Sequence, residues 1–204
     1  MFTIHIPIAF SSLLAPLLGI SPVSLFLLPL HVVLLELVID PTCSIVLERQ
    51  PAEADIMDRP PRNPSEKLLT AKMLTKSILQ GVVVFGASFA VYYQGILIGP
   101  DNARVARTMG LSIIFIANVL LVLVNSSERE LAFKTLISQA HDRVMWTVIL
   151  GTFAALGVML YTPLNSMLKL APLSLAQMML VLGVSFASVM WYELVKVYRY
   201  LKSR

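Results

Sequence analysis

Six long apolar segments alternate with polar stretches along the 204-residue chain. Most of them are close to the ~20 residues that an α-helix needs to cross the hydrocarbon of a bilayer. The first is short for a span and contains Pro7 and Pro16. The pattern predicts an all-α fold, an integral membrane bundle of six helices that forms one domain over residues 1–204 and has a cytoplasmic loop at 48–76. The predicted spans are residues 4–20, 25–47, 77–98, 109–124, 144–161 and 175–195.

Composition supports the same class. The chain is 57% hydrophobic and 14% charged, and its mean hydropathy is +0.78. This leaves too little polar surface to cover a soluble globule, so the lipid bilayer is the predicted partner. No basic segment or cleavage site accompanies the first apolar run, and we expect no removable signal peptide. The single cysteine, Cys43, excludes an internal disulfide and is expected to be a core residue.

Basic residues are distributed unequally between the apolar segments. Thirteen of the sixteen lie after the second segment, after the fourth and in the C-terminal tail, and the other three are Arg104, Arg107 and Lys169. Because cytoplasmic loops carry the excess of Lys and Arg, this asymmetry predicts a cytoplasmic C-terminus. It also accounts for the pI of about 9.3. There is no basic groove with interleaved aromatic residues, and we expect no nucleic-acid partner.

Two carboxylates interrupt the second apolar segment. Glu36 and Asp40 are four residues apart, which places both on one face of a helix with their Cβ atoms about 5–6 Å apart. Lipid cannot solvate them, so their ionisation requires a cation, a proton or a buried partner. We interpret the pair as a cation site. The alternative is that a neighbouring helix satisfies both charges and that they have no role in transport.

Helix-breaking prolines accompany these candidate ligands. Pro41 follows Asp40 and removes the backbone donor for the carbonyl of Leu37. Pro7, two residues after His5, has the same effect in the first segment. Carbonyl oxygens freed at membrane depth, together with carboxylates, are the ligands that a hard cation requires. The sequence therefore predicts that both interrupted helices contribute to the site.

Other polar groups within the apolar segments are weaker candidates. Thr42 and Ser44 place hydroxyls near the carboxylates, and Asn118 is the only strongly polar group in the middle of the fourth segment. Asn118 predicts either a cation ligand or an interhelical hydrogen bond. For His5 and His31, each taken singly, a structural role is the alternative to binding.

The polar stretch at residues 48–76 is long for a helix connection and contains four prolines among charged residues. This composition predicts an ordered, extended segment that docks against another part of the protein. A solvated connector stiffened by its prolines is the alternative. The chain contains no glycine-rich phosphate loop, Ser/His/Asp arrangement or metal-spaced His/Cys cluster, so we predict no site for soluble catalysis.

Several strings resemble one known family. The Leu-Val-Ile-Asp run at 37–40, followed by Asp-Ile-Met-Asp-Arg-Pro-Pro-Arg at 55–62, resembles the sixth transmembrane helix and following loop of P-type cation ATPases of the calcium-pump and sodium-pump class. The resemblance implies that the chain corresponds to the fifth to tenth helices of a ten-helix pump. Further matches, in order, are His-Ile-Pro at 5–7, Arg-Thr-Met-Gly-Leu-Ser at 107–112, Asn-Ser-Ser-Glu at 125–128 and Ala-Pro-Leu-Ser-Leu at 171–175.

The resemblance also implies roles for single residues. Asp40 falls on the invariant aspartate of the family's cation site, and Glu36 falls on the Asn or Asp one turn earlier. His5 falls on the fifth-helix asparagine, and Asn118 on a glutamate position of calcium pumps. Ile8, however, stands where the family usually has a ligating glutamate. With these residues at the ligand positions, a single cation or protons are as plausible a cargo as the two calcium ions of the family's familiar site.

The same family carries a coupling loop and a phosphorylation domain. The resemblance implies that Asp55, Asp58, Arg59 and Arg62 form a coupling loop docked under that domain. Such pumps phosphorylate an aspartate in an Asp-Lys-Thr-Gly-Thr motif, which is not present here, so we expect no ATP hydrolysis by this route from the chain alone. The remaining pump domains are expected as partners in cis or in trans. The implied cargo is calcium or another cation, and Mg-ATP is a cofactor of the full-length pump only.

Two other functions stay open. The chain could act alone as a passive channel or proton-coupled carrier with the acidic pair as a relay, or it could be a structural subunit for another membrane protein. The Glu-Leu-Val-Ile-Asp-Pro pattern and the short outward loops are more typical of bacterial than of animal chains. We therefore predict a multi-pass protein of the bacterial inner membrane.

Overall fold

The computed structural model describes residues 2–49, 57, 69–126, 132–133, 137 and 142–202. Within these ranges the chain forms helices and turns and no strand, which confirms the all-α prediction. The proposed coupling-loop residues Asp55, Asp58, Arg59 and Arg62 lie outside them. The elements are α1 (Phe2–Leu17), η1 (Pro22–Ser24), α2 (Pro29–Glu48), α3 (Ala71–Ile98), η3 (Pro100–Asn102), α4 (Ala103–Asn125), α6 (Arg143–Tyr161), α7 (Leu164–Met167) and α8 (Leu175–Lys202).

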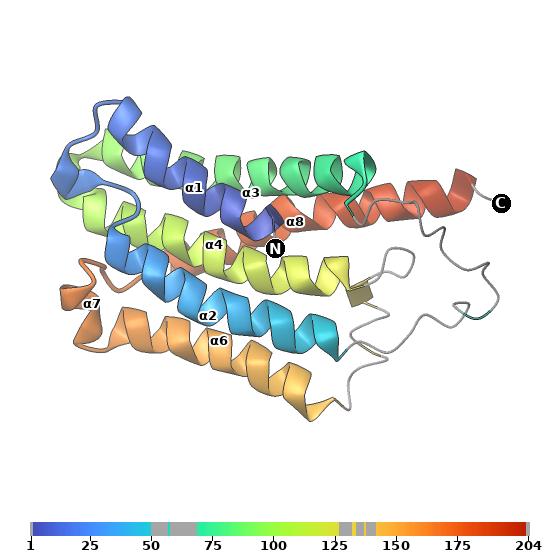
Figure 1. Ribbon diagram of the computed structural model, residues 1–204. Helices are drawn as coiled ribbons and strands as arrows, with labels where there is room; N and C mark the ends of the chain where they lie inside the picture. Colours follow the sequence, from blue (N-terminus) through green and yellow to red (C-terminus); the bar gives the residue numbers. More distant parts are fainter. Residues whose placement is uncertain are drawn as a thin grey trace.

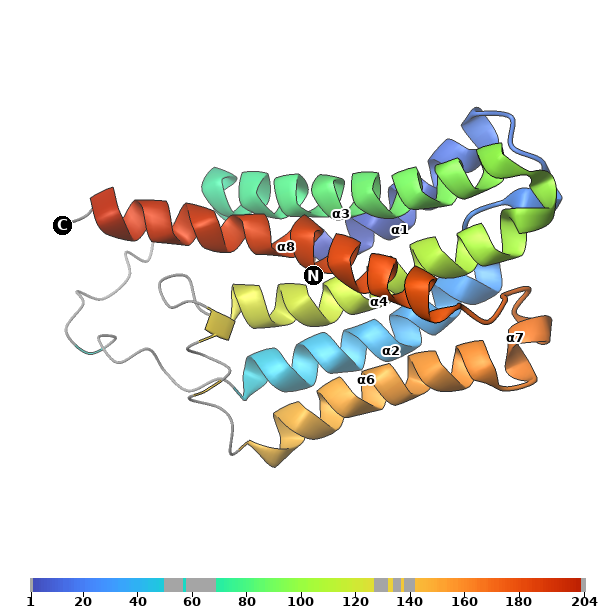
Figure 2. The same ribbon diagram turned by 180° about the vertical axis from the view of Figure 1, so that it is seen from behind.

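Helix α4 is the centre of the bundle. It packs against α2, α3, α6 and α8, while α1 lies along α3 and α2 lies along α6 (Figures 1 and 2). In α4, 78% of the span is buried, against 22–33% for the other spans. The long helices run nearly parallel to one another, as expected when short connections join neighbouring helices in a bundle (Figure 1). Side chains on α4 therefore meet side chains from most of the other helices.

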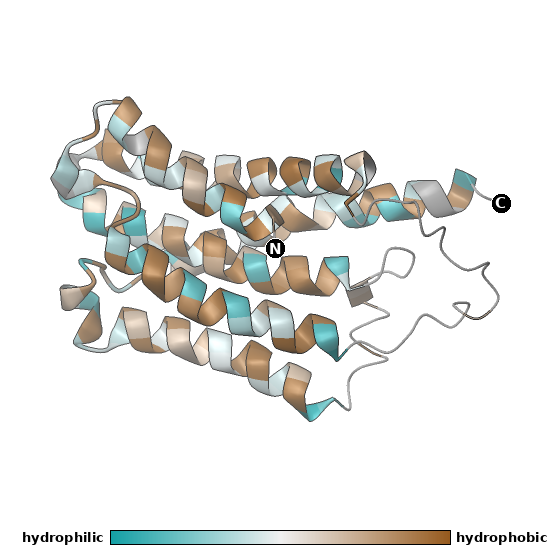
Figure 3. Ribbon diagram, viewed as in Figure 1, coloured by the Kyte–Doolittle hydropathy of each residue, from teal (hydrophilic) through white to brown (hydrophobic). Residues whose placement is uncertain are grey.

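Five of the described helices are long and apolar enough to cross a membrane: α2, α3, α4, α6 and α8. Helix α1 has 16 residues, which at 1.5 Å per residue is shorter than the ~30 Å of hydrocarbon. The first predicted span is therefore present as a shorter apolar helix. Figure 3 shows hydrophobic residues along much of the length of each helix. Exposed leucines such as Leu13, Leu150 and Leu194 fit a lipid-facing surface of a multi-pass membrane protein.

Two helices begin six residues earlier than the apolar pattern predicts. Helix α3 starts at Ala71, where the Thr70 side chain accepts a hydrogen bond from the backbone nitrogen of Met73 and caps the helix. Helix α4 starts at Ala103, so Arg107, assigned to a loop by the hydropathy pattern, lies inside the helix. Polar residues at a helix end carry no apolar periodicity, and the pattern therefore places such boundaries too late.

Asp142 fixes the start of α6. Its carboxylate accepts hydrogen bonds from the backbone nitrogens of Val144 and Met145, and it lies 3.6 Å from Arg49 at the end of α2. The hydrogen bond from Val144 is the main cause that lowers the pKa of Asp142, and the neighbouring Arg49 adds to the effect. Helix α6 is thereby tied to the end of α2 by a side chain that must be ionised to make both contacts.

A pH dependence follows from this lowered pKa. The stabilisation by Asp142 is fully present above the ordinary carboxyl pKa of 3.8 and is lost as the pH falls through the lower folded-state value. We expect Asp142→Asn, which retains a capping oxygen, to show a smaller loss of thermal stability than the wild type between about pH 7 and about pH 3. Circular dichroism melts in detergent measure this difference, and parallel profiles for the two proteins would contradict it.

Candidate cation site

Three side chains that could bind a metal ion meet between α1 and α2. His5 on α1 and Glu36 and Asp40 on α2 each offer one ligand atom, and these atoms lie within 4.8 Å of one another. His5 Nε2 donates to Glu36 Oε2 across 3.2 Å. Because Glu36 and Asp40 are one helical turn apart on α2, their carboxylates share a face, as their spacing predicts. The histidine approaches this face from α1.

Two buried polar groups, one on α2 and one on α4, lack hydrogen-bond partners within the described part of the chain. One carboxylate oxygen of Asp40 is inaccessible and has no partner. Asn118 on α4 is buried, and neither its amide nitrogen nor its amide oxygen is bonded. Buried polar atoms of this kind are costly unless a ligand, ion, water or proton satisfies them. The interhelical hydrogen bond considered for Asn118 is not formed, and its role as a ligand stays a prediction.

Thr42, two residues after Asp40, faces a different helix. The Thr42 hydroxyl donates to the carbonyl of Val38 and lies 3.3 Å from the hydroxyl of Thr152 on α6. Cys43 is buried in the hydrophobic core, as predicted. Thr42 therefore links α2 to α6 and is not directed to the carboxylates of Glu36 and Asp40.

The prolines do not interrupt their helices as predicted. Helix α2 continues through Pro41, and both Leu37 and Pro41 are on its exposed side, so the carbonyl freed by Pro41 is on the face away from the core. Helix α1 likewise continues through Pro7. The carbonyl that lacks a donor there belongs to Thr3 and faces Gly81 on α3. A membrane helix can continue through a proline when neighbouring groups satisfy the backbone carbonyl that the proline leaves without a donor.

The chemistry of the cluster is that of an incomplete cation site. Two carboxylates and one imidazole supply negative charge and three ligand atoms, whereas hard divalent cations take six or more ligands in most protein sites. The side chains of His5 and Glu36 are 45% and 34% exposed, so the cluster is open on one side. Water or side chains outside the described residues are needed to complete a coordination shell.

Two polar residues are buried at the end of the bundle where α2 and α4 begin, and the sequence indicated only one of them, His31, as a candidate. Arg107 on α4 is 1% exposed and donates to two backbone carbonyls. His31 on α2 is fully buried and lies 2.6 Å from the carbonyl oxygen of Leu168. An arginine just before an apolar segment normally indicates a loop, and only the three-dimensional packing distinguishes this buried one.

Comparison with known proteins identifies the family of this chain. Residues 24–198 match the family described as "Cation transporting ATPase, C-terminus". The chain belongs to this family. A calcium-transporting ATPase of Bacillus subtilis (strain 168) is 25% identical over 163 residues, which are 78% of this chain and 18% of that protein. The chain thus spans less than a fifth of this relative's length.

Membership in the cation-transporting ATPase family confirms the resemblance to the C-terminal membrane region of P-type pumps. Glu36, Asp40 and Asn118 lie within the matched range, whereas His5 precedes it. The candidate cluster therefore combines two carboxylates from the matched range with a histidine that precedes it in the sequence.

Proposed function

We propose that this chain is the cation-binding and translocation region of an ATP-driven P-type cation pump, and that Glu36, Asp40 and His5 hold the transported cation. The observation that carries the proposal is the convergence of their three ligand atoms within 4.8 Å in a chain that is only 14% charged. Carboxylates are rare in membrane helices because they are costly there, and those that occur commonly mark ion or proton pathways.

Binding of a cation replaces the contact now made by His5. Without the cation, the His5 Nε2–H donates to Glu36. When the cation arrives it takes the Glu36 oxygen, and His5 binds it through a ring nitrogen without a proton, the Nε2 proton passing to the other ring nitrogen or to water. Deprotonated carboxylates bind the cation, so protons compete with it and affinity falls on acidification. Asn118 supplies a further amide oxygen when the site is loaded. Access then alternates between the two sides of the membrane as α2 shifts relative to its neighbours.

Energy for this cycle comes from other parts of the pump. Mg-ATP binding and phosphorylation belong to domains that act with this chain in cis or in trans, and Asp55, Asp58, Arg59 and Arg62 couple them to the membrane helices. The open side of the cluster is where further pump helices complete the coordination shell. The chain lies in the bacterial inner membrane with its C-terminus in the cytoplasm. The small fraction of the relative that the chain covers supports this division of labour.

The ligand chemistry narrows the choice of cation. Two carboxylates and carbonyl-type oxygens suit calcium, which the name of the Bacillus subtilis relative also suggests. Manganese accepts the same oxygen ligands and an imidazole nitrogen as well. Magnesium demands a near-ideal octahedron and keeps most of its water, and we expect it to bind most weakly.

Cation binding to the purified chain in lipid nanodiscs tests the proposal. Mn²⁺ binding is followed by electron paramagnetic resonance of the free ion, and Ca²⁺ competes with it. We expect Asp40→Asn to weaken Mn²⁺ binding by at least about tenfold, because the site loses one of its two charges. Glu48→Gln is the matched control, since it removes an exposed carboxylate from the end of the same helix. Equal affinities for Asp40→Asn and the wild type would overturn the assignment.

A further inference from the structure

A second polar cluster lies at the end of the bundle where α2 and α4 begin. It surrounds the segment 168–171, which runs between α7 and α8. Three side chains from the two transmembrane helices bind the backbone of this segment, and we call the arrangement the clasp. Its members are His31 on α2 and Arg107 and Thr108 on α4. The clasp is separate from the cation cluster, because His31 precedes Glu36 by five residues, or about 7 Å of helix rise.

The contacts of the clasp are directed to backbone atoms. His31 Nε2 donates to the carbonyl of Leu168, and its Nδ1 accepts from the backbone nitrogen of Leu28, which fixes the ring. Arg107 Nη1 donates to the carbonyl of Lys169 across 2.9 Å. The hydroxyl of Thr108 accepts from the backbone nitrogen of Ala171, also across 2.9 Å. Helices α2 and α4 are therefore held by neighbouring residues of one short segment.

Arg107 also holds the connection between the two helices that carry the cation ligands. Its Nε donates to the carbonyl of Leu25, 2.8 Å away, in the stretch that joins α1 to α2. Tyr92 on α3 donates to the carbonyl of Ser24 in the same stretch, and Phe26 stacks on the Tyr92 ring. A buried guanidinium that donates to carbonyls of two separate segments gives them a defined spacing, because its donors form a rigid fork.

The backbone of the clasped segment is itself constrained. Lys169 has a φ of +52°, in the left-handed region that favours glycine. It follows the short helix α7, and the backbone nitrogen of Leu170 donates to the carbonyl of Asn165, as in a helix end closed by a left-handed residue. This conformation presents the Lys169 carbonyl to Arg107 while the lysine side chain remains exposed.

We infer that Arg107 and His31 are positioning residues for the cation site, because the clasp fixes α2, which carries Glu36 and Asp40, relative to α4, which carries Asn118. The effect of the clasp on cation binding rests on the proposed function. Its effect on the spacing of α2 and α4 does not. A movement of α2 away from α4 must break the clasp on one of its two sides. Either His31 on α2 loses Leu168, or Arg107 and Thr108 on α4 lose their contacts with the same segment. Release of the clasp therefore accompanies any opening of the site at this end.

Two measurements on the same variants test separately whether the clasp sets the spacing of α2 and α4 and whether this spacing affects cation binding. Spin labels at Val33→Cys on α2 and Arg104→Cys on α4, both exposed positions, report the interhelix distance in a Cys43→Ala background. Mn²⁺ binding reports the site. We expect Arg107→Gln and His31→Phe to broaden the distance distribution and to weaken Mn²⁺ binding about tenfold. His31→Gln, whose amide can still donate to the Leu168 carbonyl, and Lys169→Gly, which keeps the backbone carbonyl, are expected to match the wild type in both.

The outcomes are distinct. An unchanged distance distribution in His31→Phe, the milder variant, would overturn the clasp even if Arg107→Gln fails to fold. A broadened distribution with unchanged Mn²⁺ affinity would overturn the positioning role. If the wild type binds no cation at all, the proposed function fails, and the distance distributions alone still decide whether the clasp sets the spacing of α2 and α4.

Discussion

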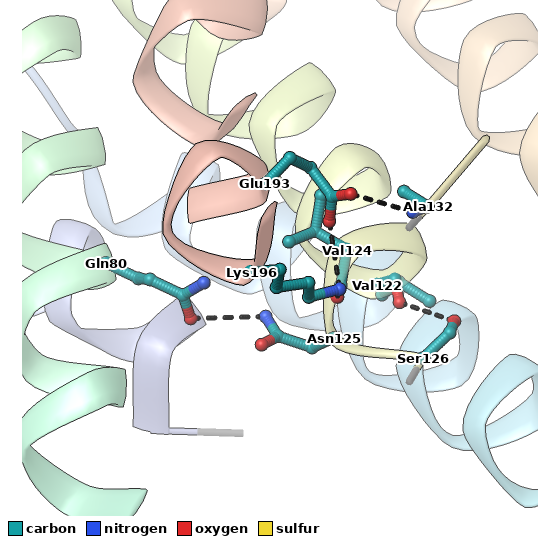
Figure 4. Close-up of polar contacts among 8 residues, drawn as sticks. All are labelled: Gln80, Val122, Val124, Asn125, Ser126, Ala132, Glu193 and Lys196. Carbon is teal, nitrogen blue, oxygen red and sulfur yellow. Dashed lines mark hydrogen bonds and ion pairs between the residues drawn. The ribbon is translucent and has the colours of Figure 1, made fainter. Parts of the chain in front are cut away.

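Replacing Lys196 by methionine is expected to destabilise the protein by about 3–5 kcal/mol. The Lys196 ammonium lies 2.9 Å from a carboxylate oxygen of Glu193 and donates to the carbonyl of Val124 across 2.6 Å (Figure 4). The side chains of Lys196 and Glu193 are only 2% and 13% exposed. Methionine at position 196 therefore leaves the Glu193 charge buried without its counter-ion. Unfolding in mixed micelles, followed by tryptophan fluorescence, measures the loss in free energy.

A double variant provides the control for this prediction. In Glu193→Gln/Lys196→Met no charge is stranded, and the glutamine oxygen can still accept from the backbone nitrogen of Ala132, as Glu193 does across 2.9 Å. We therefore expect the double variant to be more stable than Lys196→Met alone. A loss below about 1 kcal/mol in the single variant would show that the pair behaves like an exposed one and would contradict the prediction.

This pair matters for the site because of where it binds. Val124 is in the last turn of α4, whose terminal carbonyls have no intrahelical donor. The ammonium of Lys196 satisfies one of them and attaches α4 to α8, and on the neighbouring face the Asn125 amide donates to Gln80 on α3 (Figure 4). Helix α4 is thus held at one end by this network and at the other by the clasp, with Asn118 between the two.

The fold class and the acidic pair could be predicted from the sequence for physical reasons. A run of apolar residues long enough to span a bilayer has few alternatives to a helix, because every backbone group must be satisfied internally. Spacing by four residues then fixes Glu36 and Asp40 on one face of that helix without reference to the rest of the chain. Both inferences depend only on local geometry, and the structure contains both features.

Features that depend on which helix faces meet could not be predicted in the same way. The burial of Arg107 is decided by carbonyls 82 and 62 residues away in sequence. The effect of Pro41 depends on which side of α2 faces the core, and this side could not be read from one apolar segment. His5 reaches Glu36 across 31 residues, so its contribution needed either the family resemblance or the structure.

Replacing Gly81 by leucine is expected to displace α1 and to dismantle the candidate cation site. A Cβ atom at Gly81 would lie 2.7 Å from the Cβ of Ile6 and 2.8 Å from the carbonyl oxygen of Thr3, distances that require the backbone of α1 to move. His5 lies between these two residues on α1, so it shifts with them relative to Glu36 and loses its position in the cluster. Overpacking of this kind costs about 1–3 kcal/mol or more, and Mn²⁺ affinity should fall with the loss of His5.

Gly86→Leu is the matched control, because Gly86 is on the same helix and no atom lies within 4 Å of its Cβ position. Thermal melts and Mn²⁺ titrations of both variants in nanodiscs give the comparison. We expect Gly86→Leu to resemble the wild type in both, since its side chain extends from an exposed position. Equal melting temperatures for the two variants would show that α1 does not pack on α3 through Gly81. A destabilised Gly81→Leu that binds Mn²⁺ with wild-type affinity would instead separate the packing of α1 from the site and remove His5 from the set of ligands.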